Sequence, residues 1–577
     1  MKKLLLLTFC IINIYTLQSQ SIEAQWLRRS CSFVNNQGQF LGGDLFGDAV
    51  CADSFGNSYN AGYFQGFQFV MDEVVQMGIN KCYINKYDSN GVRLWTKGIA
   101  GEDINNIITI HRMVTDEIGN LYVCGMAGGN QNFTLAPNIY PIGGGFIAKY
   151  DSNGNNIWCK YVNQNSTATI TFRDMEISNG YLYLCGNIPY STVNFESYTF
   201  NVTQNGIGMI TKLDLDGNVI HAESITTSAT NRVYGLAVSN TTNNIYLVGE
   251  YLNGDFTVDG LTSAFTDGAT NSFVLKMDEN FNGIWLKKGI TQLNELATVG
   301  SGEKCLKAVE IDNLDNIYAI GNGNGNYTQF GNFSFNHLLH LGYMQDIYTI
   351  KFNSDGVEQW LRFGQSNAID TVTDIMTDQW GNSTIAVHSG LNGLGNLNFD
   401  NYSIQLWHGG LVKYDPNGNI LYVQQLQENR TLRQLDLGLN STFFGTGTGF
   451  NSGMPYVNLT NLTQCEHPSG YQANYAMVMA KFLDNTSVLS TSSQAASSIK
   501  VYPNPTHDIL TIDFNEISID FNIKITIVDV MGKAIEINKY ESLNSTITIN
   551  TSSLSKGVYF LKIEGEKIAL NSKFVKA

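Results

Sequence analysis

The stretch CYINKYDSNGVRLWTKGI, residues 82–99, decides the fold, because versions of it return along the whole chain of 577 residues. Its core, KYDSNG, stands unchanged at 86–91 and at 149–154. In each copy an apolar segment ends in a lysine and a polar turn, and a second apolar or aromatic segment follows. The marker lysines are Lys86, Lys149, Lys212, Lys276, Lys351, Lys413 and Lys481. The chain therefore contains seven copies of one unit.

A second motif alternates with the first, as in DEIGNLYVCG at 116–125, and it also occurs seven times. Each motif consists of two short apolar or aromatic strands around a turn of Gly, Asn or Asp, which is the pattern of a β-hairpin. One unit therefore predicts four antiparallel strands. A sheet of this size cannot bury both faces alone, and radial stacking of such sheets solves the problem. The sequence predicts an all-β fold with a seven-bladed β-propeller.

The seventh unit no longer matches the repeat after Asn485, so it lacks the strand that carries a tryptophan in other units. A match to this strand lies at the start of the chain, where AQWLRRS (24–30) is similar to EQWLRFG (358–364). We expect the N-terminal strand to complete the last blade and so to remove an exposed sheet edge. On these motifs, residues 22–487 resemble the secreted bacterial seven-bladed β-propeller repeat family. The resemblance implies a fold but no activity, because that family has no common one.

A Ser-rich linker at 488–498 precedes residues 499–577, whose alternating strands predict a small Ig-like β-sandwich. This tail resembles the type A C-terminal sorting domain of the type IX secretion system of Bacteroidetes. The matching residues are Tyr502, Pro503, Asn504, Pro505, Met531, Gly532, Lys533, Leu554, Gly557, Tyr559, Ile563, Lys573, Phe574, Val575 and Lys576. The resemblance implies contact with the type IX machinery and translocation across the outer membrane. Release or attachment to surface lipopolysaccharide would follow.

The N-terminus, MKKLLLLTFCIINIYTLQSQS, has two lysines, an apolar run from Leu4 to Tyr15, and then small and polar residues. This order is typical of a secretory signal peptide, here residues 1–21 with cleavage after Ser21. A membrane anchor is the alternative, but the run is shorter than the ~20 residues that a spanning helix needs. No other segment is apolar enough to cross a bilayer. We therefore expect an extracellular or outer cell-surface protein.

The net charge bears on which partners the protein can bind, and the cysteine spacing bears on whether its thiols form disulfides. The net charge of −16, from 34 Lys and Arg against 50 Asp and Glu, argues against nucleic acid as a partner. Export would permit disulfides, but the cysteine spacings are long and no CxxC occurs, so packing is favoured over bridging and any pairing stays open. The cysteines after the signal peptide are Cys31, Cys51, Cys82, Cys124, Cys159, Cys185, Cys305 and Cys465.

KYDSNG also suggests a calcium loop, since Asp88 and Asn90 offer oxygen ligands before Gly91. An EF-hand loop needs a distal Glu, which the repeats lack, whereas NG and DG are preferred hairpin turns, so the turn is favoured. His337 and His340 form an HLLH pair that would need a further ligand from elsewhere, and a plain loop is favoured over a metal site. We expect no metal and no cofactor.

Propellers generally bind ligands where the innermost strands begin, and the sequence before the second motif carries charges there. The candidate residues are Asp48, Arg112, Arg173, Asp174, Arg232, Lys307, Asp374 and Arg433. Such a ring suits a glycan or a peptide, so the leading hypothesis is a non-enzymatic adhesion or scaffold module for a polysaccharide or a protein. The alternative is an extracellular propeller enzyme that cleaves glycans or peptides, which needs converging carboxylates, or a Tyr or His beside an Arg.

Overall fold

The chain forms two compact units, Met1–Leu489 and Ser490–Ala577, in a computed structural model. The structure describes residues 22–32, 42–45, 47–66, 68–70, 74–76, 80–101, 107–128, 132–135, 138–140, 143–163, 170–189, 192–202, 206–225, 230–252, 254–267, 269–292, 305–338, 345–390, 394–405, 408–426, 430–450, 475–486, 500–513, 524–529, 534–537, 541–543, 546–564 and 569–577. The expected signal peptide and linker lie outside these residues. Within them, no helix has the length and apolar character needed to cross a membrane.

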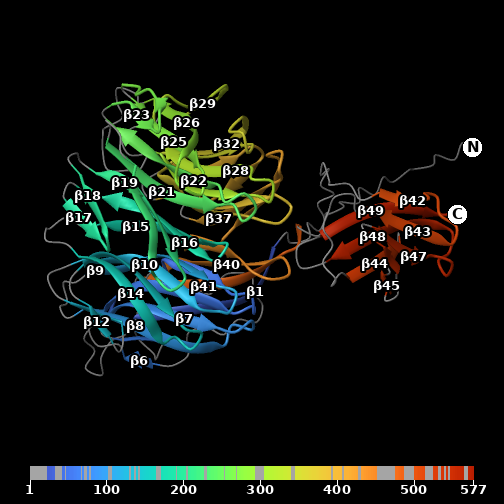
Figure 1. Ribbon diagram of the computed structural model, residues 1–577, viewed down its shortest axis with the longest axis horizontal. Coiled ribbons are helices and arrows are strands. Elements are labelled where there is room, and N and C mark those ends of the chain that lie inside the picture. The colour runs from blue at the N-terminus through green and yellow to red at the C-terminus, as the bar shows by residue number, and fades with distance from the viewer. Residues whose placement is uncertain are drawn as a thin grey trace, which may run out of the picture. The chain divides into compact units, whose positions relative to one another are not determined.

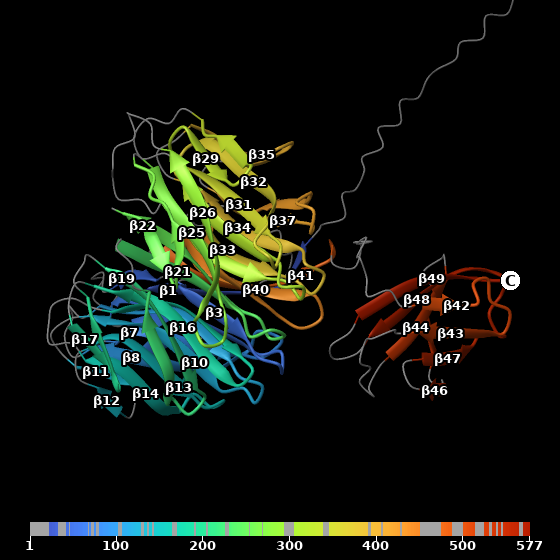
Figure 2. The same cartoon turned by 45° about the horizontal axis from the view of Figure 1, so that its top comes forward.

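The first unit is built from groups of four antiparallel, hydrogen-bonded strands (Figures 1 and 2), and in four of the groups the sheet continues into further strands. The first three groups are β3 (Ala49–Ala52), β4 (Ser58–Gly66), β7 (Asn80–Tyr87) and β8 (Arg93–Gly101); β9 (Ile107–Thr115), β10 (Leu121–Gly128), β13 (Gly143–Tyr150) and β14 (Asn156–Asn163); and β15 (Thr171–Ser178), β16 (Tyr181–Ile188), β19 (Ile207–Asp214) and β20 (Val219–Ser224). Each group corresponds to one sequence repeat.

Four further groups follow in the described residues. They are β21 (Thr230–Val238), β22 (Ile245–Leu252), β25 (Ala269–Met277) and β26 (Gly283–Gln292); β27 (Leu306–Ile311), β28 (Ile317–Gly323), β31 (Asp346–Phe352) and β32 (Glu358–Asn367); β33 (Asp370–Thr377), β34 (Ser383–Ser389), β37 (Gly409–Tyr414) and β38 (Ile420–Gln425); and β39 (Arg430–Leu437), β40 (Thr442–Phe450), β41 (Tyr475–Asp484) and β1 (Ile22–Ser32). Every element in the part of the chain that the structure describes is a strand, which confirms the predicted all-β class.

The last group takes its outer strand from the start of the chain, as predicted. β1 pairs with β41 (Figure 1), and Trp26 lies opposite Lys481. The same partners recur elsewhere, for example Trp95 opposite Lys86. β1 therefore occupies the register of an outer strand of any other group.

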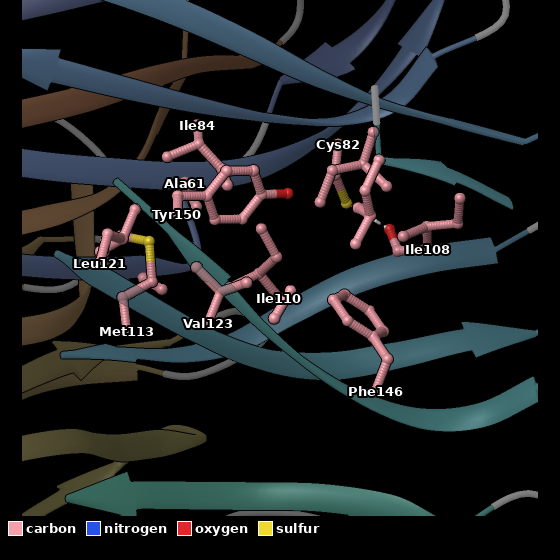
Figure 3. Packing of buried hydrophobic residues seen from close by; sticks show 14 of the residues in the cluster. Ala61, Cys82, Ile84, Ile108, Ile110, Met113, Leu121, Val123, Phe146 and Tyr150 are labelled. Atoms are coloured by element: carbon pink, nitrogen blue, oxygen red, sulfur yellow. Dashed lines mark hydrogen bonds between the residues drawn. The ribbon is translucent and has the colours of Figure 1, made fainter. Parts of the chain in front are cut away.

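Hydrophobic clusters join successive groups. Cys82 and Ile84 of β7 pack against Ile108 and Ile110 of β9, and all four are fully buried (Figure 3). Full burial of one such aliphatic side chain contributes about 1.5–3 kcal/mol before entropy is counted. A cluster of the same kind joins the last group to the first and includes Trp26. Each sheet thus covers the face that its neighbour leaves open.

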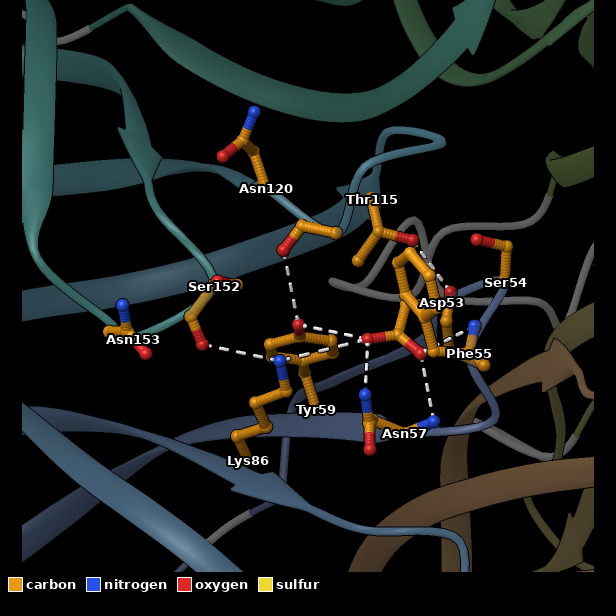
Figure 4. Close-up of polar contacts among 12 residues, drawn as sticks. Asp53, Ser54, Phe55, Asn57, Tyr59, Lys86, Thr115, Asn120, Ser152 and Asn153 are labelled. Atoms are coloured by element: carbon orange, nitrogen blue, oxygen red, sulfur yellow. Dashed lines mark hydrogen bonds and ion pairs between the residues drawn. The ribbon is translucent and has the colours of Figure 1, made fainter.

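The turn after the third strand of a group follows the marker lysine and is here called the Lys-Tyr-Asp turn. These turns connect neighbouring groups through hydrogen bonds. Lys86 Nζ donates to the backbone oxygen of Ser152, in the turn of the next group, at 3.2 Å (Figure 4). Trp95 Nε1 donates to the same oxygen at 3.0 Å. Gly154 in that turn has φ +77°, and a Cβ there would stand 3.1 Å from the Trp95 ring, so glycine allows the close contact. Trp26 and Lys481 make the same bonds to Ser89 in the first group.

The turn carboxylates are occupied by their own turns. Asp88 Oδ1 accepts the backbone N–H groups of Asn90 and Val92, at 2.9 and 2.7 Å. Asp151 does the same in the next copy and also binds the side chain of Asn155. Within the described residues, no group of three or more His, Cys, Asp or Glu side chains is placed to hold a metal ion. KYDSNG therefore acts as a hairpin turn here.

The second unit contains two four-stranded antiparallel sheets. Their strands are β42 (Lys500–Tyr502), β43 (Ile509–Asp513), β47 (Thr546–Asn550) and β46 (Glu541–Leu543); and β45 (Ala534–Ile537), β44 (Lys524–Asp529), β48 (Gly557–Glu564) and β49 (Ala569–Lys576). Inward side chains from both sheets, such as Ile512, Ile527 and Phe574, form one buried cluster. This alternation of buried and exposed residues is what the sequence of the tail predicts.

Candidate functional site

The innermost strands share a β-bulge at one position. In six groups a single residue of the innermost strand is skipped in the pairing with the second strand. The skipped residues are His111, Arg173, Tyr234, Lys307, Thr373 and Arg433. In the first group the equivalent residue, Asp48, lies directly before β3. A bulge redirects a side chain from the regular alternation of a strand, and bulges are common beside functional sites.

These bulge residues surround one cavity of about 740 Å³, here called the central cavity. The cavity is lined by Asp48, Tyr63, Thr109, Ile110, His111, Arg173, Tyr234, Lys307, Thr371, Val372, Thr373, Thr431 and Arg433. Every innermost strand thus contributes the same register position. Around the cavity β3 contacts β9, each later innermost strand contacts the next, and β39 contacts β3.

One side of the cavity is closed by an ion pair. Arg433 Nη1 lies 2.7 Å from Asp48 Oδ1. Burial raises the pKa of Asp48, although the charge of Arg433 acts in the opposite direction. Asp48 is the one carboxylate among the lining residues, and it is engaged in the ion pair with Arg433.

The opposite side carries cations around a tyrosine. The guanidinium of Arg173 lies over the ring of Tyr234, 5.9 Å from its centroid. The Tyr234 hydroxyl donates to Glu250 Oε1 at 2.9 Å, and Glu250 also binds Arg232. Lys307 follows on the next innermost strand, β27. Tyr234 is therefore held at both its face and its hydroxyl, with a cation on either side along the ring of strands.

His111 is held by hydrogen bonds at both ring nitrogens. Its Nδ1 donates to the backbone oxygen of Phe172 at 2.6 Å, so Nε2 accepts from the hydroxyl of Thr109 at 3.0 Å. Burial lowers the pKa of His111 to about 4. The imidazole is neutral with both nitrogens bonded, and it serves to join β9 to β15.

The residues next to the bulges form a buried charged cluster. Arg112 Nε lies 3.2 Å from Asp174 Oδ1, and its Nη1 lies 3.4 Å from Asp374 Oδ2. Glu310 is 3.8 Å from Nη2. Burial lowers the pKa of Arg112, but these carboxylates outweigh it and raise the value, so the guanidinium stays charged. Burial also raises the pKa of Asp374 to about 6.

The carboxylates of this cluster also bind backbone groups of neighbouring strands. Asp174 accepts from the N–H of Leu236, and Asp374 from that of Leu435. Two more members bind in the same way: Glu176 accepts from Val238 and Asp436 from Ala52. These bonds connect consecutive innermost strands, including the last to the first. The cluster therefore has a structural role in joining the strands.

The eight residues predicted for the mouth fall into two sets. Asp48, Arg173, Lys307 and Arg433 line the central cavity, whereas Arg112, Asp174, Asp374 and Arg232 do not. The first three of the latter belong to the buried cluster, and Arg232 is exposed and paired with Glu250. Sequence reasoning missed the uncharged lining residues, above all His111, Tyr234 and Thr373. These residues stand at the same position before the second motif as the charged lining residues. That shared position, and not charge, would have identified them from the sequence.

The other sequence candidates are placed as follows. His337 is buried, and it binds Asp346 through Nδ1 at 2.9 Å and Thr328 through Nε2 at 2.8 Å, which leaves neither nitrogen for a metal. His340 lies outside the described residues. Six cysteines are free thiols, five of them buried, which agrees with packing: Cys51, Cys82, Cys124, Cys159, Cys185 and Cys305. Cys465 and the side chain of Cys31 are not among the described parts.

In the tail, the two ends of the sorting motif meet. Asn504 Oδ1 accepts the N–H of Val575 at 2.8 Å, and Thr506 exchanges backbone hydrogen bonds with Val575 and Ala577. Pro503 and Pro505 flank this contact and are exposed. Tyr559 is buried and donates to the backbone oxygen of Ser555. Gly557 starts β48; Gly532, Lys533 and the side chain of Lys573 lie outside the described parts.

Solved structures offer distant similarities to much of the chain. Polysaccharide lyase Uly1 is 9% identical, with 80% of this chain and 98% of that chain covered and a TM-score of 0.40. A puromycin hydrolase mutant complexed with PGG is 8% identical (70% and 50% covered, TM-score 0.39). A mutant of Synechocystis apocarotenoid oxygenase is 11% identical (71% and 92%, TM-score 0.30). Likenesses this distant carry no conclusion about activity.

No curated protein sequence matches the chain significantly. A family model matches at the C-terminus, where residues 500–577 fit the family described as the secretion system C-terminal sorting domain. This match confirms the sorting domain that the motifs of the tail predict. Residues 500–577 are therefore a C-terminal sorting domain of the type IX secretion system, which directs the chain to the cell surface or the medium.

Proposed function

We propose that the chain is a secreted or surface-displayed seven-bladed β-propeller that binds a polysaccharide or a protein at its central cavity, without catalysis. Its parts would be a signal peptide (1–21), the propeller (22–487), a linker (488–498) and the sorting domain (499–577), which has an Ig-like fold. The propeller would belong with the secreted bacterial repeat family that it resembles. The observation that carries the proposal is the ring of seven residues, varied in chemistry, at one repeated position.

Contacts between the last and first strand groups support the closed propeller. β39 touches β3, Trp26 of the last group bonds to Ser89 of the first, and a shared hydrophobic cluster lies between them. In addition, β5 (Gln68–Val70) of the first group pairs with β1 of the last. The same relation links other neighbours, for example β11 (Phe133–Leu135) with β8.

Among the described residues, the lining of the cavity lacks paired carboxylates, but it does bring Tyr234 beside Arg173, the other arrangement that a cleaving enzyme would need. We favour binding because the Tyr234 hydroxyl already donates to Glu250. Cleavage of a glycosidic bond by the usual route needs two carboxyl groups that flank it. The lining residues include one carboxylate, Asp48, which Arg433 occupies. His111 has both nitrogens bonded and so lacks the free position of a general base. A lining rich in Thr, Tyr and cations suits recognition of a polar ligand.

A plugged variant tests the binding site. Thr373→Trp would fill the cavity from β33, and we expect it to abolish binding of any polysaccharide or protein that the purified chain captures. Gln359→Ala, an exposed change outside the cavity lining, is the control. Unchanged binding by the folded Thr373→Trp protein would refute the site. Accumulation of cleaved glycan or peptide would instead favour the enzyme alternative.

Truncation tests the export route. Removal of 499–577 should leave the chain inside the cell envelope, measured by immunoblot of cell fractions and medium. Fusion of the same residues to a periplasmic reporter should carry the reporter outside. Export of the truncated chain at the normal level would contradict the role of the tail.

A further inference from the structure

The charge of the central cavity is opposite to that of the chain. Among the six bulge residues and the equivalent Asp48, Arg173, Lys307 and Arg433 are cations and Asp48 is an anion, while His111 is neutral. The chain as a whole carries a net charge of −16. A positive cavity in an acidic protein confines favourable contacts with an anion to the cavity, because the surrounding surface repels anions.

The cations are not equivalent. Arg433 is bonded to Asp48 at 2.7 Å. Arg173 is exposed, and among the described residues no carboxylate forms an ion pair with it; its guanidinium rests over Tyr234. Arg173 and Lys307 come from β15 and β27, the strands on either side of β21, which carries Tyr234. Two cations thus flank one buried aromatic side chain along one wall.

The buried carboxylates near the cavity outnumber Arg112, but they are bound within the fold and leave the lining itself cationic. Asp174 and Asp374 contact Arg112, and both also accept backbone N–H groups. Burial raises the pKa of Glu176 to about 8, so this residue is mostly neutral at pH 7. Neither these residues nor Arg112 line the cavity.

The remainder of the lining indicates a carbohydrate. Thr371, Thr373 and Thr431 bring hydroxyl groups to the same cavity, and hydroxyls both donate to and accept from sugar hydroxyls. A volume of about 740 Å³ is within the range of small-molecule sites and suits a few sugar residues, not a folded domain. A sugar that also carries a carboxylate or a sulfate would satisfy both the threonines and the cations.

We infer that the central cavity binds an acidic polysaccharide, with a uronate carboxylate or a sulfate ester held by Arg173 and Lys307. This inference rests on the proposed binding function and specifies its ligand. Guanidinium bonds to carboxylate or sulfate are charge-assisted and stronger than neutral hydrogen bonds. Arg173 is positioned by the ring of Tyr234, which limits the freedom that the side chain would lose on binding.

Binding of three polysaccharides to the full chain tests the inference: alginate (a polyuronate), carrageenan (a sulfated galactan) and laminarin (a neutral glucan). We expect calorimetry to detect alginate or carrageenan and not laminarin. Arg173→Gln and Lys307→Gln should each weaken binding about tenfold, and added salt should weaken it further. The matched control is Lys160→Gln, which removes one cation at a surface pair with Glu196, and it should change the affinity less than about twofold.

The outcomes, with polyglutamate as a fourth probe, separate the inference from the proposed function. Laminarin binding that Thr373→Trp abolishes, but that Arg173→Gln and Lys307→Gln leave intact, would overturn the acidic ligand and keep the cavity as the site. Acidic polysaccharide binding that survives Thr373→Trp would overturn both. Binding of polyglutamate alone, weakened by Arg173→Gln, would replace the glycan with an acidic protein. Failure of all four probes to bind would also overturn the inference.

Discussion

The two ends of the strand groups differ in how much their residues vary. At the Lys-Tyr-Asp turns, five groups repeat the same lysine and tryptophan contacts to the next turn, as Trp95 and Trp360 do with Ser152 and Pro416. At the bulges, the innermost strands carry different residues at one shared position. The constant end holds the groups together, and the variable end has the chemical diversity that recognition of a ligand requires.

Two groups depart from the pattern. In the sixth, Tyr422 lies opposite Lys413 where most other groups have a tryptophan. Between the third and fourth groups, His221 takes the place of the tryptophan, and Phe281 takes the place of the turn glycine at φ 68°. Their rings are 4.9 Å apart. The imidazole of His221 is smaller than an indole, and the ring of Phe281 fills the space beside it where most other turns have glycine. The contact between the two groups therefore persists although both residues differ.

The largest expected effect comes from loss of a repeated contact at the constant end. Trp360→Ala should lower the free energy of unfolding by about 3–5 kcal/mol, because the indole is 4% exposed and bonds to the next group. Urea unfolding followed by fluorescence and circular dichroism would measure it. The exposed neighbour Gln359→Ala should change stability by less than about 0.5 kcal/mol. Equal effects of the two changes would contradict the assigned role of the turns.

The turn between the third and fourth groups should show coupling of a smaller size. His221→Trp alone should destabilise the protein, because the indole would collide with Phe281. Adding Phe281→Gly should recover part of that loss by restoring the Trp–Gly contact of the other turns. We expect a coupling of about 1–2 kcal/mol in a double-mutant cycle of unfolding free energies. Additive effects would show that the two residues changed independently.

The buried carboxylates should make stability depend on pH. Burial raises the pKa of Glu176 from 4.5 in the free side chain to about 8 in the folded chain. The folded state therefore favours the protonated form, and lowering the pH from about 8 to about 6.5 should add about 1–2 kcal/mol of stability. Below that window the opposite trend of His111 enters, since burial lowers its pKa to about 4.

Thermal unfolding of the parent chain and of Glu176→Gln at the two pH values checks this expectation. Glutamine keeps an acceptor for Val238 and cannot titrate. The melting temperature of the variant should depend less on pH than that of the parent. An identical pH dependence would assign the effect to other groups, such as Glu310.

The smallest effect on stability is expected at the variable end. Arg173→Gln should change the free energy of unfolding by less than about 0.5 kcal/mol, since the side chain is exposed and contacts mainly one ring. The same change should alter ligand affinity. Chemical denaturation of this variant beside Trp360→Ala would compare the two ends directly. A large loss of stability in Arg173→Gln would contradict the distinction between the turns, which stabilise the fold, and the bulge residues, which line the cavity.

The repeats predicted the strands and their turns because hairpin formation depends on local sequence. NG and DG turns between apolar segments, and the match between AQWLRRS (24–30) and EQWLRFG (358–364), were enough to predict the pairing of β1 in the last group. The candidate site was predicted less well. Charge alone grouped Arg173 with Asp174, although the first lines the cavity and the second lies in the buried cluster.

The sequence by itself determined the sevenfold repeat, the β-class and the sorting tail, because these depend on local patterns and short motifs. Only the tertiary structure decided which residues surround the cavity. A bulge places two neighbouring residues against one partner residue, and a register difference of a single residue changes where a side chain points. The positions of Tyr234 and Arg173 side by side also depend on how adjacent sheets pack, which no single repeat encodes.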